Sequence, residues 1–357
     1  MTESTTKQKI FIDAGIENIR VWIYDWFTEN DSEILSDTIV ISNNDDLRKL
    51  FRESGVMELF FNEDSSLKNG VESIYITGKL ADITRKVLGL GKPVMPAAVL
   101  WSAAKSFLHQ NENRKKETIG IIDLSASGYM AICIDENARL KDDLLIVNPR
   151  CGAGTGINLS RILHKLNISR NDVDGLLDDY LGERGRVKRD QVPVRSDRCG
   201  VFSSSATISD KNQGIPLDYA LAITMKSEVM KPCRKIPSGI DKVYLSGGVF
   251  RWQYARNCAE DILKSNGVGE VVYDNEQSIS IAGMKHLAEG IGPGNDRKQN
   301  TVRLRKPDTL FEFPSFNSLK EKYGKRGLYK RLPDPETELL SPGMIMNLPV
   351  NIGLDIG

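Results

Sequence analysis

KIFIDAGIENIRVWIYDWF, residues 9–27, contains an apolar segment, a short polar turn and a second segment in which apolar and polar residues alternate. A period of two is typical of a half-buried strand, and glycine followed by polar residues is typical of a turn. We therefore predict a hairpin whose first strand ends near Asp13 and whose turn runs from Gly15 to Asn18.

A second hairpin of the same kind follows at residues 117–135, ETIGIIDLSASGYMAICID. Asp123 takes the place of Asp13, and small residues from Ser125 to Gly128 form the turn. Helical periodicity fills the chain between the two hairpins, most clearly in the apolar segment that begins near Pro96. Two such hairpins separated by helices predict an α/β protein in which both turns face one ligand.

A cysteine precedes a glycine-rich turn and a helix in NPRCGAGTGINLSRILHKL, residues 148–166. The apolar positions in its second half have the i, i+3, i+4, i+7 spacing of a buried helical face. Cys151 would therefore stand near a helix N-terminus, where the helix dipole stabilises a thiolate or an anionic cluster bound to it. The turn itself alternates glycine with small residues at Gly152, Gly154 and Gly156. A free cysteine beside an ordinary turn is the alternative.

Cys199 has the same surroundings in SDRCGVFSSSATIS, residues 196–209, because it follows an arginine, precedes a glycine and stands where a helix can begin. The two cysteines lack close partners that would complete four metal ligands, so a full site would need another subunit or domain. Cys133 alternates within an apolar strand and is predicted to be core. Cys233 and Cys258 are predicted to be structural.

A third glycine segment follows the apolar strand at residues 242–246. Gly247 and Gly248 lead from this strand toward a helix, and such a βα loop can pass close to a nucleotide. The GAGTG segment, in contrast, lacks the G-x-G-x-x-G spacing of a dinucleotide-binding turn.

Composition limits the functional classes. The chain has 357 residues, 40% of them hydrophobic, with 48 basic and 48 acidic residues. This length favours two or three domains, and zero net charge gives no broad footprint for nucleic acid or for an anionic membrane. A polar N-terminus, the lack of a long apolar run and an odd number of scattered cysteines predict a cytoplasmic protein without a membrane anchor or a disulfide framework.

The chain changes character after Gly290. Residues 291–350 are basic and contain several prolines, which predicts a linker. Residues 351–357, NIGLDIG, repeat the pattern of the first strand with Asp355 in the place of Asp13. We therefore expect an N-terminal lobe over 1–115, a C-terminal lobe over 116–290, a linker, and the truncated first strand of a second, tandem copy.

The order of these motifs resembles the activators of 2-hydroxyacyl-CoA dehydratases and the ATPase subunits of benzoyl-CoA reductase, the BadF/BadG/BcrA/BcrD-type family. NPRCGAGTGINLSRIL and SDRCGVFSSSATIS are similar to the two cysteine segments of that family. VYLSGGVFRW, residues 243–252, is similar to its adenosine-contacting segment, and ITGKLADITRKVLG, residues 76–89, to its Thr-Gly-Tyr-Gly stretch.

The resemblance implies a two-lobed actin-like ATPase fold, related to sugar kinases and heat-shock chaperones, with each lobe a mixed sheet flanked by helices. It implies ATP with Mg²⁺ in the cleft and a [4Fe–4S] cluster held by Cys151 and Cys199 across a homodimer or between tandem copies. One low-potential electron would then pass to an anaerobic acyl-CoA dehydratase or reductase. The implied catalytic residues are Asp13 and Asp123; the implied nucleotide contacts are Gly15, Ser125, Ser127, Gly154, Thr155, Gly156, Gly247 and Gly248.

Two departures from the family pattern affect the ATPase expectation. The first turn has Ile16, Glu17 and Asn18 where the family has small hydroxyl residues, and Glu17 would place a carboxylate against phosphate. The second turn lacks the family's amide and carboxylate side chains. We therefore expect a degenerate copy that hydrolyses ATP weakly. Two alternatives remain, a sugar or N-acylhexosamine kinase and a non-catalytic regulatory or scaffold domain.

Overall fold

The structure is a computed structural model that describes residues 6–27, 32–62, 68, 70–109, 117–147, 155–180, 188–195, 200–273 and 278–290. The chain divides into two compact units, Met1–Gly292 and Pro293–Gly357. All described residues belong to the first unit. The predicted linker 291–350 and the predicted strand 351–357 lie outside the described residues.

The first sheet is built around β1, in the strand order β3-β2-β1-β4-β5. β1 pairs antiparallel with β2, which confirms the first predicted hairpin, and parallel with β4. Successive side chains of a strand point to opposite faces, so Ile10 and Ile12 enter one core cluster and Phe11 enters another. The strands are β1 (Thr6–Ala14), β2 (Asn18–Phe27), β3 (Ser32–Ser42), β4 (Val71–Thr77) and β5 (Lys92–Pro93).

The second sheet repeats this topology around β6, in the order β8-β7-β6-β9-β10. β6 pairs antiparallel with β7, as the second hairpin predicts, and parallel with β9. Ile122 and Leu124 of β6 enter one core cluster, while Ile119 and Ile121 enter another on the opposite face. The strands are β6 (Ile119–Ser125), β7 (Gly128–Ile134), β8 (Leu140–Val147), β9 (Lys242–Ser246) and β10 (Glu270–Tyr273).

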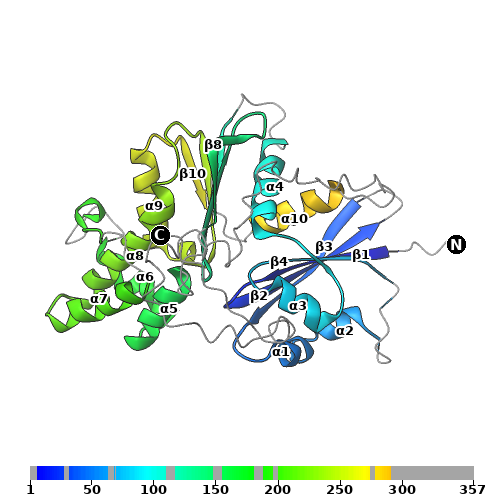
Figure 1. Ribbon diagram of the computed structural model, residues 1–357. Coiled ribbons are helices and arrows are strands. Elements are labelled where there is room, and N and C mark those ends of the chain that lie inside the picture. The colour runs from blue at the N-terminus through cyan, green and yellow to red at the C-terminus, as the bar shows by residue number, and fades with distance from the viewer. Residues whose placement is uncertain are drawn as a thin grey trace, which may run out of the picture. The chain divides into compact units, whose positions relative to one another are not determined.

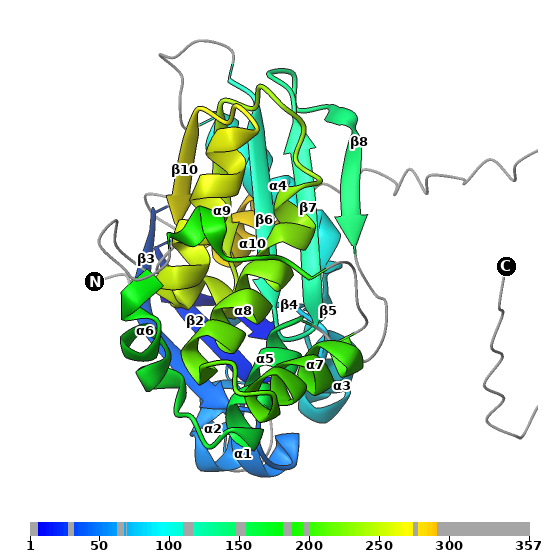
Figure 2. The ribbon, with the colours of Figure 1, turned by 90° about the vertical axis from the view of Figure 1, so that its left-hand side faces the viewer.

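Helices cover both faces of each sheet. Figure 1 shows α4 (Pro96–His109) and α10 (Ser278–Gly290) side by side between the two sheets, where they supply residues to the clusters that contain Phe11 and Ile121. Figure 2 shows the helices on the outer face of the second sheet. The first sheet's outer helices are α1 (Leu47–Glu53), α2 (Val56–Phe60) and α3 (Ala81–Leu88).

The second lobe carries more helices. α5, α6, α8 and α9 bury their apolar residues against the second sheet, and α7 packs on α5 and α8. Their bounds are α5 (Thr155–Lys165), α6 (Val173–Leu176), α7 (Gly200–Asn212), α8 (Leu217–Cys233) and α9 (Gln253–Ser265), and the 3₁₀ turns are η1 (Arg170–Asp172), η2 (Asp178–Tyr180), η3 (Arg189–Gln191) and η4 (Gly248–Arg251). None of the helices in the described ranges is long and apolar enough to cross a bilayer.

The structure contains elements that the sequence patterns do not predict. The helical periodicity between the two hairpins is interrupted at Gly55, which has a φ of 74° and separates α1 from α2. After α5, the chain forms the short elements η1, α6 and η2 and not one continuous helix. The outer strands β3 and β8 were not predicted. β8 is irregular at Asp142 and Asp143, whose φ is near 50° and which lie between the residues that pair with β7.

Candidate functional site

A pocket of about 380 Å³ lies where the carboxyl ends of β1, β4, β6 and β9 meet. These four strands run parallel within the two sheets, so their ends present loops from both lobes to one space. Such a crevice is the usual ligand site of open α/β sheets. The polar and glycine residues that line it include Asp13, Gly15, Glu17, Arg20, Thr77, Gly78, Lys79, Asp123, Ser125, Ser127, Arg170, Ser246, Gly247, Gly248, Arg251 and Ser280.

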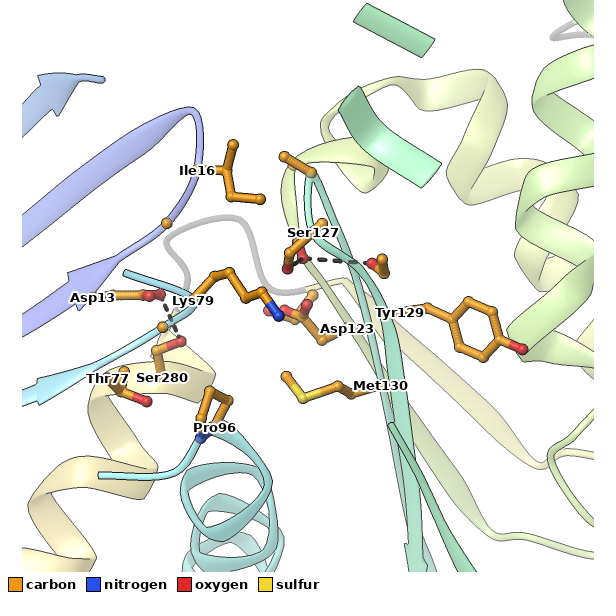
Figure 3. Close-up of a pocket in the computed structure, with 18 of the residues that line it drawn as sticks. Asp13, Ile16, Thr77, Lys79, Pro96, Asp123, Ser127, Tyr129, Met130 and Ser280 are labelled. Atoms are coloured by element: carbon orange, nitrogen blue, oxygen red, sulfur yellow. Dashed lines mark hydrogen bonds between the residues drawn. The ribbon is translucent and has the colours of Figure 1, made fainter. Parts of the chain in front are cut away.

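Asp13, near the end of β1, lies on the pocket wall of the first lobe (Figure 3). Ser280 of α10 donates a hydrogen bond from its Oγ to Oδ2 of Asp13 over 3.1 Å. Arg20 lies directly opposite Asp13 in the β1–β2 register. Burial raises the pKa of the Asp13 carboxyl above its ordinary value, and Arg20 and Ser280 oppose part of that rise.

Asp123 occupies the equivalent position of β6, and its carboxyl is perturbed as well. Burial, followed by the charge of Asp13, raises the pKa of Asp123 from 3.8 to about 6. Hydrogen bonds with Ser125 and Ser246 and the charge of Arg20 act in the opposite direction. The two aspartates therefore repel each other across the pocket, and a cation bound between them would relieve that repulsion.

The two hairpin turns line opposite walls of the pocket. In the first turn, the Gly15 N–H donates to Asn18 O over 3.1 Å, and the Asn43 side-chain amide donates to Ile16 O over 2.8 Å. In the second turn, Ser125 Oγ and Ser127 Oγ lie 3.0 Å apart and share a hydrogen bond. The second turn thus presents small hydroxyl side chains, whereas the first has its Gly15 amide engaged within the turn.

A glycine follows the parallel partner strand in each lobe and presses against the residue after the aspartate. Gly78 has a φ of 96°, and a Cβ at this position would lie 2.5 Å from Ala14 O and 2.8 Å from Asp13 Oδ1. Gly247 has a φ of 100°, and its Cβ would lie 2.4 Å from Leu124 O. Both positions need a left-handed residue without a side chain, so the walls beside Asp13 and Asp123 are built alike.

Glu17 connects the first turn to the second lobe. Its carboxylate forms an ion pair with Arg170 and accepts a 2.6 Å hydrogen bond from Ser160 Oγ of α5. Arg170 also donates to Ser160, and its carbonyl accepts a 3.0 Å hydrogen bond from the Trp252 indole. The repulsion between Glu17 and a phosphate, expected from the sequence, is therefore reduced because Arg170 neutralises this carboxylate.

Several basic and hydroxyl residues of the pocket were missed by sequence reasoning. Arg20 had a usable signal, since a strand position opposite Asp13 can be counted from the turn. Lys79 and Arg251 had no such signal, because exposed charged residues are common on protein surfaces. Their place in the pocket depends on how Gly78 and Gly247 are packed.

Some predicted site residues lie elsewhere. Gly156 does not line the pocket; it packs against the second turn, where a Cβ would lie 2.8 Å from Ser125 O and from Ala126 N. Thr155 begins α5, and its side chain is outside the described residues. Gly154 and both predicted cluster ligands, Cys151 and Cys199, also lie outside the described residues.

The three cysteines that the structure describes are buried and free, which agrees with their predicted core and structural roles. Burial raises the pKa of Cys133 and of Cys258 to about 12, and it also raises the pKa of Cys233. These thiols therefore stay protonated at neutral pH. Across the described ranges, no three His, Cys, Asp or Glu side chains gather into a metal-binding group.

Comparison with known sequences gives a limited match. No protein-family model matches the chain. An uncharacterized protein of Methanocaldococcus jannaschii is 28% identical over 137 residues, which cover 37% of this chain and 50% of that protein. The chain thus spans half the length of this curated relative.

Two solved structures are similar to the chain at low sequence identity. Component A of (R)-2-hydroxyglutaryl-CoA dehydratase from Acidaminococcus fermentans matches with 16% identity and a TM-score of 0.53, over 80% of this chain and 98% of that one. The activator of 2-hydroxyisocaproyl-CoA dehydratase from Clostridium difficile, with bound ADPNP, matches with 15% identity and a TM-score of 0.52, over 80% and 95%. With its two mixed sheets flanked by helices, the chain has the two-lobed fold of actin-like ATPases.

Proposed function

We propose that this protein binds ATP with Mg²⁺ in the pocket and acts as an ATP-dependent activator of an acyl-CoA dehydratase or reductase. The observation that carries the proposal is the convergence of both aspartate strands, both turns and the Gly247–Gly248 segment on one pocket. The fold adds support, since one of the two similar structures is a dehydratase component, and the other is a dehydratase activator by name and holds bound ADPNP.

The pocket suits a nucleotide with a divalent ion. Its volume of about 380 Å³ falls within the usual range of small-molecule sites. Asp13 and Asp123 supply the oxygen ligands that Mg²⁺ prefers, directly or through water. Ser125 and Ser127 offer hydroxyl groups to phosphate, and the backbone at Gly247 and Gly248 leaves room for the nucleoside. Bound Mg²⁺ would offset the phosphate charge and the repulsion between the aspartates.

For electron transfer, we propose that Cys151 and Cys199 bind a [4Fe–4S] cluster together with the same cysteines of a second protomer or a second activase copy. The described helices support this assignment, because α5 begins four residues after Cys151 and α7 begins directly after Cys199. The helices touch each other, with Lys165 Nζ donating to Ser204 Oγ over 3.4 Å. Helix N-termini near the cysteines would stabilise the negative charge of a thiolate-bound cluster.

Weak ATP hydrolysis is part of the proposal. The first turn holds a carboxylate at Glu17, and the second turn has only Ser125, Ala126 and Ser127 before Gly128. A water molecule attacking phosphate must be positioned by a polar side chain, and these small hydroxyl groups are poorly suited to that task. Steady-state turnover on the order of 1 per second or faster would contradict this part.

A second candidate, a small-molecule kinase, is favoured by Asp123 alone. A kinase needs a carboxylate that accepts the proton of the substrate hydroxyl, and a pKa of about 6 in the pocket suits a general base. Phosphate transfer to a sugar or amino sugar, abolished by Asp123→Asn, would favour this candidate. Sugar phosphorylation by protein that is purified anaerobically and contains no iron–sulfur cluster would contradict the proposed electron-transfer function.

The proposed activator function is tested by anaerobic purification with iron and sulfide analysis. We expect about four irons per two chains in the wild-type protein and loss of the cluster in Cys151→Ala and Cys199→Ala. Cys258→Ala is the matched control, since Cys258 is buried in α9 and should not bind iron. Unchanged iron content in Cys151→Ala, with the same circular dichroism spectrum, would contradict the cluster assignment.

A further inference from the structure

We propose that Lys79 is a phosphate-binding residue of this pocket and that it makes the pocket selective for phosphorylated ligands. The inference rests on the proposed binding of ATP, and it assigns a role to a residue that was not among the predicted nucleotide contacts. Figure 3 shows the Lys79 side chain extending into the pocket from the turn that follows β4.

The backbone that carries Lys79 is fixed on both sides. Gly78 is pressed against Ala14 O at the end of β1, so no side chain fits between them. On the other side of Lys79, the Leu80 N–H donates to the same Ala14 O over 2.9 Å. Thr77, which is buried, donates from its Oγ1 to Val94 O over 3.0 Å. The starting point of the Lys79 side chain is therefore held beside Asp13, at the wall of the pocket.

The Lys79 ammonium is available to a ligand. Its residue is exposed, and within the described part of the chain no ion pair or hydrogen bond engages it. The neighbouring cations differ in this respect, because Arg170 is paired with Glu17, and Arg20 acts on the charges of Asp13 and Asp123. Within the described residues, a ligand that enters the pocket thus meets a lysine of the first lobe whose charge is not offset by an ion pair.

The charge balance of the pocket explains why such a cation is needed. The carboxylates of Asp13 and Asp123 line the same space and would repel a phosphate chain, whereas the third carboxylate, that of Glu17, is paired with Arg170. Arg251 supplies an exposed guanidinium to the pocket from the second lobe. Lys79 supplies a positive charge to the same pocket from the first lobe. An ammonium on a flexible stem binds phosphate as a point charge and can follow its position.

The test measures ATP and adenosine binding by isothermal titration calorimetry in wild type, Lys79→Met and Lys79→Arg. We expect Lys79→Met to weaken ATP binding by about tenfold or more, the size of one lost charge-assisted contact, and to leave adenosine binding unchanged. Lys79→Arg should retain most of the ATP affinity because it keeps the charge. Lys86→Met, an exposed lysine of α3 outside the pocket, should bind ATP like the wild type.

Repeating the titration in EDTA sharpens the result. Without Mg²⁺ the phosphates carry more negative charge, so we expect Lys79→Met to lose a larger factor of ATP affinity in EDTA than in Mg²⁺. Equal ATP affinity of Lys79→Met and wild type would overturn the inference, and so would an equal loss for ATP and adenosine, which indicates a general change of the pocket. A wild-type protein that binds no ATP would instead refute the proposed function.

Discussion

The two hairpin turns occupy equivalent places in the two sheets, yet they have different chemistry. The first turn carries Glu17 and is tied across the pocket to Arg170 and Ser160. The second turn is uncharged and is packed beneath α5 through Gly156. The shared part is the framework, an aspartate strand beside a glycine of positive φ. The strand and glycine positions thus fix where the aspartates lie, while the side chains of the turns determine how strongly the pocket attracts or repels a phosphate.

The largest expected effect concerns the shared framework. Gly78→Ala and Gly247→Ala should each lower the free energy of unfolding by about 2–4 kcal/mol, because the new Cβ adds backbone strain and overlaps a carbonyl. Urea denaturation measures this. Gly214→Ala is the matched control, with a φ of 87° but no atom near the added Cβ, and it should cost about 1 kcal/mol. An equal loss of unfolding free energy in all three variants would show that the close contacts of Gly78 and Gly247 with the neighbouring carbonyl groups do not contribute to stability.

The second effect concerns Asp123 and pH. Its pKa is about 6 in the folded protein against 3.8 ordinarily, so between about pH 4 and 6 the folded state holds a proton that the unfolded state has released. The free energy of unfolding should therefore fall as pH rises through this window. Asp123→Asn should remove that slope and stabilise the protein above pH 6 by about 2–3 kcal/mol.

The control for this pH dependence is Asp135, which follows β7. Backbone hydrogen bonds, from the Arg139 N–H above all, lower the pKa of its carboxylate, so Asp135→Asn should leave the slope between pH 4 and 6 in place. Urea denaturation at several pH values provides the measurement. A wild-type slope that persists in Asp123→Asn would mean that another group, such as Asp13, controls it.

The smallest effect tests the charged turn. Glu17→Gln should tighten ATP binding by about fivefold and Arg170→Gln should weaken it by a similar factor, because an exposed ion pair contributes only about 1 kcal/mol. The double variant should bind nearly like the wild type. Ser127→Ala, in the uncharged second turn, is the control and should change the affinity less. Weaker binding in Glu17→Gln would indicate that the connection to Arg170 holds the pocket in its binding form.

The sequence predicts the first hairpin because Ile19, Val21 and Ile23 alternate with polar residues, and it predicts the second because the same order of apolar strand, aspartate and small turn residues returns at Asp123. It does not predict β3 or β8, whose extended form comes from pairing with neighbouring strands. The pairing of Glu17 with Arg170 joins residues that are 153 positions apart, so no local pattern shows it. Lys79 is a surface-type residue in the sequence, and only the contact between Gly78 and Ala14 places it in the pocket.

Hydrogen–deuterium exchange with and without ATP and Mg²⁺ tests most directly whether both turns bind one nucleotide. We expect slower exchange on ligand addition in peptides that cover residues 13–20 and in those that cover 123–130, with no change around Asp135. If only one turn is protected, the two turns do not bind the same nucleotide. The same conclusion follows if neither turn is protected under conditions where calorimetry detects ATP binding.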